Sequence, residues 1–189
     1  MARWEPNAPQ RLADAALELF TERGYDNTTV LDIAQRAGLA KSSFFRHFQD
    51  KREVLFGENV LIEPMATAIA EAPAGASPLE AMARGFDVLG RDVFTSDHRS
   101  FAVRRRAVIE THPDLQEREA LKGVSLTASM AEAMARRGAP ELVADVTAQL
   151  GTLALKLTLD RWIDPGNTEE FADIARLIVQ DVRTAVATV

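Results

Sequence analysis

The chain has 189 residues, of which 47% are hydrophobic and 26% are charged, with 28 acidic and 22 basic residues. This composition is typical of a globular protein and excludes disordered and fibrous architectures, while the length allows one domain or a small module joined to a larger one. Cysteine is absent, which excludes disulfides, cysteine-ligated zinc, iron–sulfur clusters and thiol nucleophiles. No run of 18 apolar residues occurs and no apolar segment precedes the first prolines, so we expect a cytoplasmic protein that does not engage a membrane.

Basic charge is concentrated in one short part of this acidic chain. Residues 1–52 carry 8 basic and 7 acidic residues, whereas residues 53–189 carry 14 and 21. Within residues 36–52 five basic residues stand against one acidic residue. This distribution predicts one surface that faces a polyanion.

The first part of the chain has the pattern of short amphipathic helices. Apolar residues recur at helical spacing over 12–20, and Gly24 is placed to end that helix. Thr29 and Asp32 have the spacing of a capping box for a second helix, which Gly38 ends.

A third helix is predicted over 41–48, so that two short helices surround a glycine turn, which is the spacing of a helix-turn-helix. A longer helix is predicted over 51–63, with Pro64 kinking or ending it. Turn residues then separate further predicted helices at 79–95, 98–111, 114–137, 141–163 and 169–187. Because no segment has the alternation of a strand, we predict an all-α protein of about nine helices.

A pattern of spaced residues runs through the predicted helix-turn-helix. It reads Leu19-Phe20-Thr-Glu-Arg-Gly24-Tyr25, then Thr28-Thr29-Val30-x-x-Ile33-Ala34-x-x-Ala37-Gly38, then Phe44-Phe45-Arg46-His47-Phe48-x-x-Lys51. This pattern resembles the TetR family of transcriptional regulators. The resemblance implies a three-helix DNA-binding domain over 1–52, followed by a helical effector-binding and dimerisation domain over 53–189.

Eight residues are predicted to contact DNA. In a helix-turn-helix the second helix enters the major groove, where lysine and serine side chains can bond to base edges. Phe44 and Phe48 are four residues apart and are expected to pack inward, which turns the residues between them toward the groove or the backbone. The resemblance adds two phosphate contacts, one before the second helix and one after the third. The predicted contacts are Thr29, Lys41, Ser42, Ser43, Phe45, Arg46, His47 and Lys51.

Two positions depart from the family pattern. The family has serine where this chain has Ala40, so the third helix loses its side-chain N-cap. It has tyrosine where this chain has Phe45, so a phosphate hydrogen bond is missing. Both departures predict weaker or differently aimed operator binding.

The C-terminal part is predicted to hold an effector and to form the dimer. Large apolar side chains of its middle helices are candidates for a pocket, together with one arginine, although most such residues belong to the core. The candidates are Phe86, Phe94, Phe101, Arg105, Ile109, Leu126, Met130, Met134 and Trp162. The last two predicted helices carry enough apolar surface to need a partner, which in the family is the same pair of a second copy. The expected interface residues are Leu150, Leu153, Leu157, Ile174, Leu177, Ile178 and Val182.

Together these features predict a homodimeric regulator, acting as a repressor at a pseudo-palindromic double-stranded DNA operator and released by a small-molecule effector. No cofactor or metal is expected, because the three histidines lack metal-ligand spacing. No enzyme is expected either, since the sequence has no nucleophile elbow, Walker loop or dinucleotide-binding glycine motif. The alternative is a helical module that sequesters a small molecule or binds a protein and has little affinity for DNA.

Overall fold

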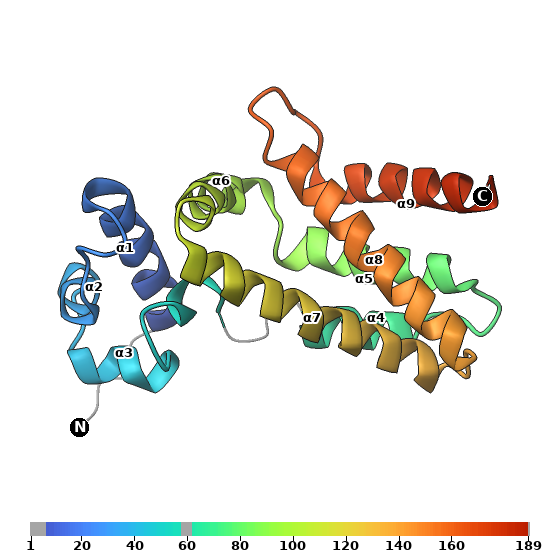
Figure 1. The fold of residues 1–189 in the computed structure, drawn as a ribbon, viewed down its shortest axis with the longest axis horizontal. Helices are drawn as coiled ribbons and strands as arrows, with labels where there is room; N and C mark the ends of the chain where they lie inside the picture. Colours follow the sequence, from blue (N-terminus) through green and yellow to red (C-terminus); the bar gives the residue numbers. More distant parts are fainter. Residues whose placement is uncertain (1–6, 58–61, 189) are drawn as a thin grey trace. The chain divides into compact units, whose positions relative to one another are not determined.

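The computed structural model describes residues 7–57 and 62–188, and within these residues it contains nine α-helices, one 3-10 helix and no strand (Figure 1). The predicted all-α fold is confirmed. The elements are α1 (Ala8–Arg23), α2 (Val30–Arg36), α3 (Lys41–His47), η1 (Glu53–Leu55), α4 (Ile62–Ala70), α5 (Pro78–Asp92), α6 (Ser96–Glu110), α7 (Pro113–Arg136), α8 (Glu141–Trp162) and α9 (Phe171–Ala187).

Tertiary contacts divide the chain into two compact units. Unit 1 combines residues of 1–59 with residues 100–119, which are most of α6 and the start of α7. Unit 2 combines residues of 60–99 with those of 120–189. The division of function at residue 52 stays a prediction.

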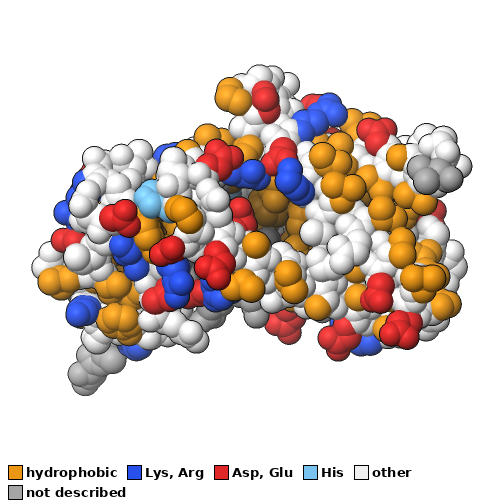
Figure 2. Space-filling view, in the orientation of Figure 1, with side chains coloured by type: hydrophobic (Ala, Val, Ile, Leu, Met, Phe, Trp, Pro, Cys, Tyr) orange, Lys and Arg blue, Asp and Glu red, His pale blue; other side chains and the backbone are white. Residues whose placement is uncertain are grey.

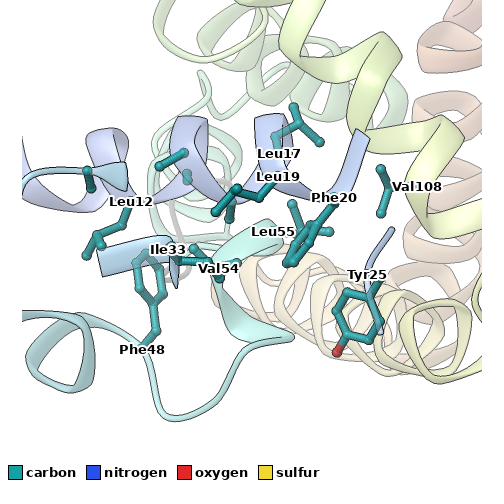
Figure 3. Close-up of a cluster of buried hydrophobic side chains, with 14 of the residues drawn as sticks. Leu12, Leu17, Leu19, Phe20, Tyr25, Ile33, Phe48, Val54, Leu55 and Val108 are labelled. Carbon is teal, nitrogen blue, oxygen red and sulfur yellow. The ribbon is translucent and has the colours of Figure 1, made fainter. Parts of the chain in front are cut away.

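Unit 1 has a hydrophobic core built by helices that are distant in sequence. Leu12, Phe20 and Ile33 are buried in one cluster with Phe44, and Val108 of α6 joins the same cluster. Figure 3 shows labelled side chains of α1, α2 and α6 turned toward this common interior. Residues 100–119 therefore complete the core under the first three helices.

The local signals for the first two helices are confirmed. Gly24 follows α1 with a φ of 86°, a left-handed conformation that suits glycine, and its N–H donates to the carbonyl of Phe20. At α2 the Thr29 hydroxyl accepts from the N–H of Asp32, and the Asp32 carboxylate accepts from the N–H of Thr29, which is a complete capping box.

The predicted continuous helix over 51–63 is wrong. Among residues 51–57, which the structure describes, only the single turn η1 forms, and Gly57 follows it with a φ of 61°, which takes the backbone out of the helical region. Val60 and Leu61, which the pattern placed on this helix, lie outside the described residues. Pro64 lies in the first turn of α4, where the ring is tolerated because the missing N–H has no partner inside a helix.

Unit 2 is built around α5, which packs against α4, α8 and α9. A Cβ added to Gly85 of α5 would lie 2.7 Å from Met65 Cγ, and one added to Gly151 of α8 would lie 2.7 Å from Met82 Cε, so these helices approach closely at glycine. By length and composition alone α8 could cross a membrane. One side of it is buried in unit 2.

Candidate nucleic-acid interface

The turn between α2 and α3 is held by backbone hydrogen bonds and by one arginine. Gly38 has a φ of 67°, and the N–H of Leu39 donates to the carbonyl of Ala34 at 2.8 Å. Arg11 of α1 donates from Nη2 to the carbonyl of Ala37 at 2.5 Å. These contacts fix the angle at which α3 leaves α2, which decides where the side chains of α3 point.

Helix α3 has one buried face and one exposed face. Phe44 is fully buried and Phe48 is 5% exposed, so the predicted inward packing of this pair is confirmed. The exposed residues of α3 are Lys41, Ser42, Phe45 and Arg46. They form two pairs, 41 with 45 and 42 with 46, and the two members of each pair are one helical turn apart. Together the four side chains form a mixed polar and aromatic surface.

Ser43 does not lie on this surface. It is 7% exposed, and its hydroxyl accepts a hydrogen bond from Arg46 Nη2 at 2.8 Å. The prediction treated the first three residues of α3 as equivalent, but successive helical residues are about 100° apart and the third of them turns toward the core. In this structure Ser43 therefore orients Arg46 rather than facing a base edge.

Thr29 and Lys51, the two expected phosphate contacts, are engaged within unit 1. The Thr29 hydroxyl donates to Asp32 Oδ2 at 2.6 Å as part of the capping box. Lys51 Nζ donates to the carbonyl of Tyr25 at 2.8 Å and lies 3.9 Å from the centroid of the Tyr25 ring. Burial lowers the pKa of Lys51. Both residues hold the fold of the unit, which sequence spacing alone does not reveal.

The Asp32 carboxylate is the most strongly perturbed acid near α3. Hydrogen bonds from the side chain and backbone of Thr29, and then from Arg23, lower its pKa to about 2. Arg23 Nη2 lies 2.7 Å from Asp32 Oδ2. The carboxylate is thus kept charged at the start of α2, where negative charge is favourable.

The basic residues of 36–52 comprise two arginines with carboxylate partners, Lys51, which bonds to the carbonyl of Tyr25, and the two basic residues of α3. Arg36 pairs with Glu18 and Glu22 of α1, at 3.1 and 2.8 Å. Arg52 pairs with Asp50. Within the described residues Lys41 and Arg46 have no carboxylate partner, so the unneutralised positive charge lies on the exposed face of α3. His47 is half-buried beside the ring of Phe48.

Ala40 precedes α3 with extended backbone angles and makes no side-chain hydrogen bond to the helix, as the missing serine predicted. The first N–H groups of α3 therefore lack a side-chain partner, which is consistent with a helix end that faces solvent or a ligand.

The nine predicted pocket residues do not form one group. Phe101, Arg105 and Ile109 lie in unit 1, where Ile109 is part of the core cluster and Phe101 packs against it. Arg105 donates to the carbonyl of Leu55 at 2.7 Å and to Glu119 at 3.0 Å. These three residues stabilise the unit that carries α3.

The other six predicted pocket residues lie in unit 2, and all but one are at most 8% exposed. Met130 of α7 and Met82 of α5 meet over Gly151, while Phe94 stacks on Phe171 with ring centroids 4.6 Å apart. The six are Phe86, Phe94, Leu126, Met130, Met134 and Trp162. None of them lines the shallow surface hollow of about 360 Å³ between α4 and α7, whose walls include Thr67, Glu132 and Arg136.

The predicted interface residues of α8 and α9 are also divided. Ile174 and Val182 are buried in their own unit, so they are core residues of the single chain. Exposed or half-buried positions remain at Leu150, Leu153, Leu157, Leu177 and Ile178. Figure 2 shows hydrophobic side chains gathered over α8 on the face in view.

Two further apolar residues of α8 were missed by sequence reasoning. Val143 and Val146 are 39% and 47% exposed, and they continue the alternating three- and four-residue spacing of Leu150, Leu153 and Leu157. We call these five residues the α8 stripe. The sequence signal that identifies them is their heptad-like spacing, which is typical of paired helices.

Comparison with known proteins identifies the first unit. A family model for bacterial regulatory proteins of the tetR family matches residues 12–57. The HTH-type transcriptional regulator TcmR of Streptomyces glaucescens is 43% identical over 83 residues, which are 43% of this chain and 37% of that protein. The negative transcriptional regulator IcaR of the Staphylococcus aureus icaADBC biofilm operon is 41% identical over 44 residues, 23% of this chain and 24% of its own length.

A solved structure extends the likeness to the whole fold. FadR of Thermus thermophilus, a TetR-family transcriptional repressor solved in complex with lauroyl-CoA, aligns over 93% of both chains with a TM-score of 0.53 and 20% identity. The sequence matches, in contrast, span between a quarter and just over a third of the curated relatives. Residues 12–57 of this chain thus match the tetR family of bacterial regulatory proteins, and the whole chain shares the fold of a solved structure described as a TetR-family repressor.

Proposed function

We propose that this chain is a DNA-binding transcriptional regulator of the cytoplasm that represses at a pseudo-palindromic operator, binds it as a homodimer and is released by a small-molecule effector. The observation that supports it most directly is the exposed face of α3. Lys41, Ser42 and Arg46 lie there on a helix whose other face is buried. Such a helix can enter the major groove without exposing the core of unit 1.

DNA binding is supported by the two basic residues of α3, for which the described part of unit 1 supplies no carboxylate partner. Lysine donates well to the O6 and N7 acceptors of guanine, and serine hydroxyls suit either kind of base edge. Arg46, held by Ser43, is placed to grip the backbone or a base beside them. In this proposal Thr29 and Lys51 contribute by holding α2 and the segment after α3, with phosphate contact as a secondary role.

The homodimer rests on the α8 stripe. An apolar row at this spacing on an exposed helix face can be buried by a second copy of the chain, because a twofold axis brings the same row of each chain together. Leu177 and Ile178 of α9 would extend the same contact. Two copies would present two α3 helices to successive major grooves.

The effector site is proposed inside unit 2, where Met82 and Met130 close over Gly151. Methionine side chains are flexible and repack readily, so an apolar effector can displace them without breaking a helix. The hydrogen bond between Thr127 and Thr152, 2.6 Å long, offers a polar group at the same helix pair. An effector releases DNA only if it binds more tightly to a conformation of the dimer in which the spacing of the two α3 helices no longer matches the operator.

The test is retention of pooled genomic DNA fragments by the purified protein at two salt concentrations, followed by sequencing. We expect one palindromic site to be enriched and its retention to fall steeply with salt, because bound phosphates release counterions. Lys41→Ala should abolish most retention, whereas Arg91→Ala, which removes one exposed charge from unit 2, should leave it unchanged.

If no fragment is enriched at low salt, the regulator proposal fails and the sequestering or protein-binding alternative takes its place. If Lys41→Ala retains DNA as well as the wild type, the exposed face of α3 is not the interface.

A further inference from the structure

Phe45 is an exception among the aromatic residues of unit 1. Its side chain is 52% exposed, whereas Phe20, Tyr25, Phe44 and Phe48 are each at most 6% exposed. An apolar ring half in water gains free energy when a partner covers it. The ring stands in the middle of α3, on the face proposed for DNA.

Neighbours on two sides restrain the Phe45 ring. The Phe44 ring meets it edge-on, with centroids 5.5 Å apart and planes at 77°. Lys41 Nζ lies 5.9 Å from the Phe45 centroid, so an ammonium group and the ring share one turn of the exposed face. The ring is therefore presented beside a cation, which favours an anionic partner over an apolar protein surface.

The chemistry of the major groove narrows what the ring can contact. Phenylalanine has no donor or acceptor, so it cannot bond to phosphate or to the polar edge of a base. The apolar group that B-DNA exposes in the major groove is the C5-methyl of thymine, and phenylalanine is among the side chains that contact it. Cytosine, adenine and guanine offer no such methyl group.

We infer that Phe45 reads the C5-methyl of one thymine in each half-site of the operator, with Lys41 directed to the neighbouring base pair. This inference rests on the proposed function, because it requires α3 to enter the major groove. It gives the exposed ring at this position, where the family pattern has tyrosine, a role in selecting a base.

The experiment uses the duplex enriched from genomic DNA, synthesised with each thymine replaced in turn by deoxyuridine. This replacement removes one methyl group and keeps base pairing. Kd is measured for the wild type, for Phe45→Ala, for Phe45→Tyr, which keeps the ring, and for Leu31→Ala. Leu31 is a matched control because it is also a half-exposed apolar residue of unit 1, but in α2.

At one thymine per half-site we expect deoxyuridine to weaken wild-type binding about fourfold, which is the effect of losing one buried methyl group. Replacing this thymine in both half-sites of the same duplex should weaken binding about fifteenfold. Phe45→Tyr and Leu31→Ala should keep this penalty. Phe45→Ala should bind the unmodified duplex more weakly and show no further loss with deoxyuridine.

The inference is overturned if no thymine position shows the penalty in the wild type, or if Phe45→Ala shows the same penalty as the wild type. Circular dichroism of Phe45→Ala checks that the variant is folded, and the penalty kept by Phe45→Tyr shows that the aromatic ring is the group that contacts the methyl. A failure of the proposed function is distinguishable, because it appears earlier, as the absence of any salt-dependent, sequence-selective binding by the wild type.

Discussion

At the scale of single residues, the start of α2 concentrates much of the local chemistry of unit 1. Asp32 accepts hydrogen bonds from the backbone and side chain of Thr29 and pairs with Arg23. A helix of seven residues has few internal hydrogen bonds, so its N-terminal cap is a large part of its stability. The same carboxylate also sets a pH dependence.

The pKa of Asp32 is lowered from 3.8 to about 2, so its ionised form is favoured by folding. A depressed pKa contributes stability that is present above about pH 4 and is lost as the pH falls toward about 2. We therefore expect Asp32→Asn to lower Tm at pH 6, and the difference from the wild type to shrink between pH 4 and pH 2. Thermal unfolding followed by circular dichroism measures it, and a difference that does not change with pH would contradict the assignment.

At the scale of elements, glycine has different structural roles in different places. Gly57 ends η1 with a left-handed conformation, whereas Gly85 and Gly123 lie inside helices. Nothing lies within 4 Å of a Cβ added to Gly123, but one added to Gly85 would meet Met65 Cγ at 2.7 Å and Ile69 Cγ1 at 3.1 Å. One glycine is therefore a weak point of α7 and the other allows α4 and α5 to pack.

The same substitution should have opposite effects at these two sites. Gly123→Ala should raise the free energy of unfolding by about 0.5–1 kcal/mol, because alanine loses less backbone entropy in a helix. Gly85→Ala should lower it by about 1–3 kcal/mol, because the added methyl group overpacks the contact between α4 and α5. Denaturant unfolding compares the pair, and a shift in the same direction for both variants would show that the close approach at Gly85 is not a constraint.

At the scale of the whole molecule, the α8 stripe is a row of apolar side chains that a single chain leaves exposed or half-buried. Leu153 is 47% exposed on α8, and Leu121 of α7 is exposed to a similar degree at 52%. Leu153 belongs to the row of five large apolar residues, whereas Leu121 has one exposed large apolar residue at that spacing, Val124. The proposed interface therefore rests on the row and not on exposure alone.

A charge in this row should separate the two copies. Leu153→Glu should raise the dimer dissociation constant at least about a hundredfold, since each copy loses a buried leucine, and should weaken operator binding with it. Leu121→Glu is the matched control and should stay dimeric. Sedimentation equilibrium measures both variants, and a dimer that tolerates Leu153→Glu would place the interface elsewhere.

Much of unit 1 could be predicted from the sequence because its signals are local. The glycine after α1, the capping box of α2 and the inward pair Phe44 and Phe48 each depend on residues within a few positions of one another. Helical periodicity likewise placed α5 to α9 to within a few residues. It failed over 51–63, where a left-handed Gly57 interrupts the pattern and a separate helix, α4, carries Pro64 in its first turn.

The amino-acid sequence by itself determined where most helices begin and end, which face of α3 is apolar, and the family that residues 12–57 match. Only the tertiary structure decided that Ser43 is buried, that Ile174 and Val182 belong to the core of one chain, and that Arg105 holds unit 1 rather than a ligand. The physical reason is range: caps and periodicity act within one or two helical turns, whereas burial is decided by which distant segment covers a given face, and a single sequence does not state which segments meet.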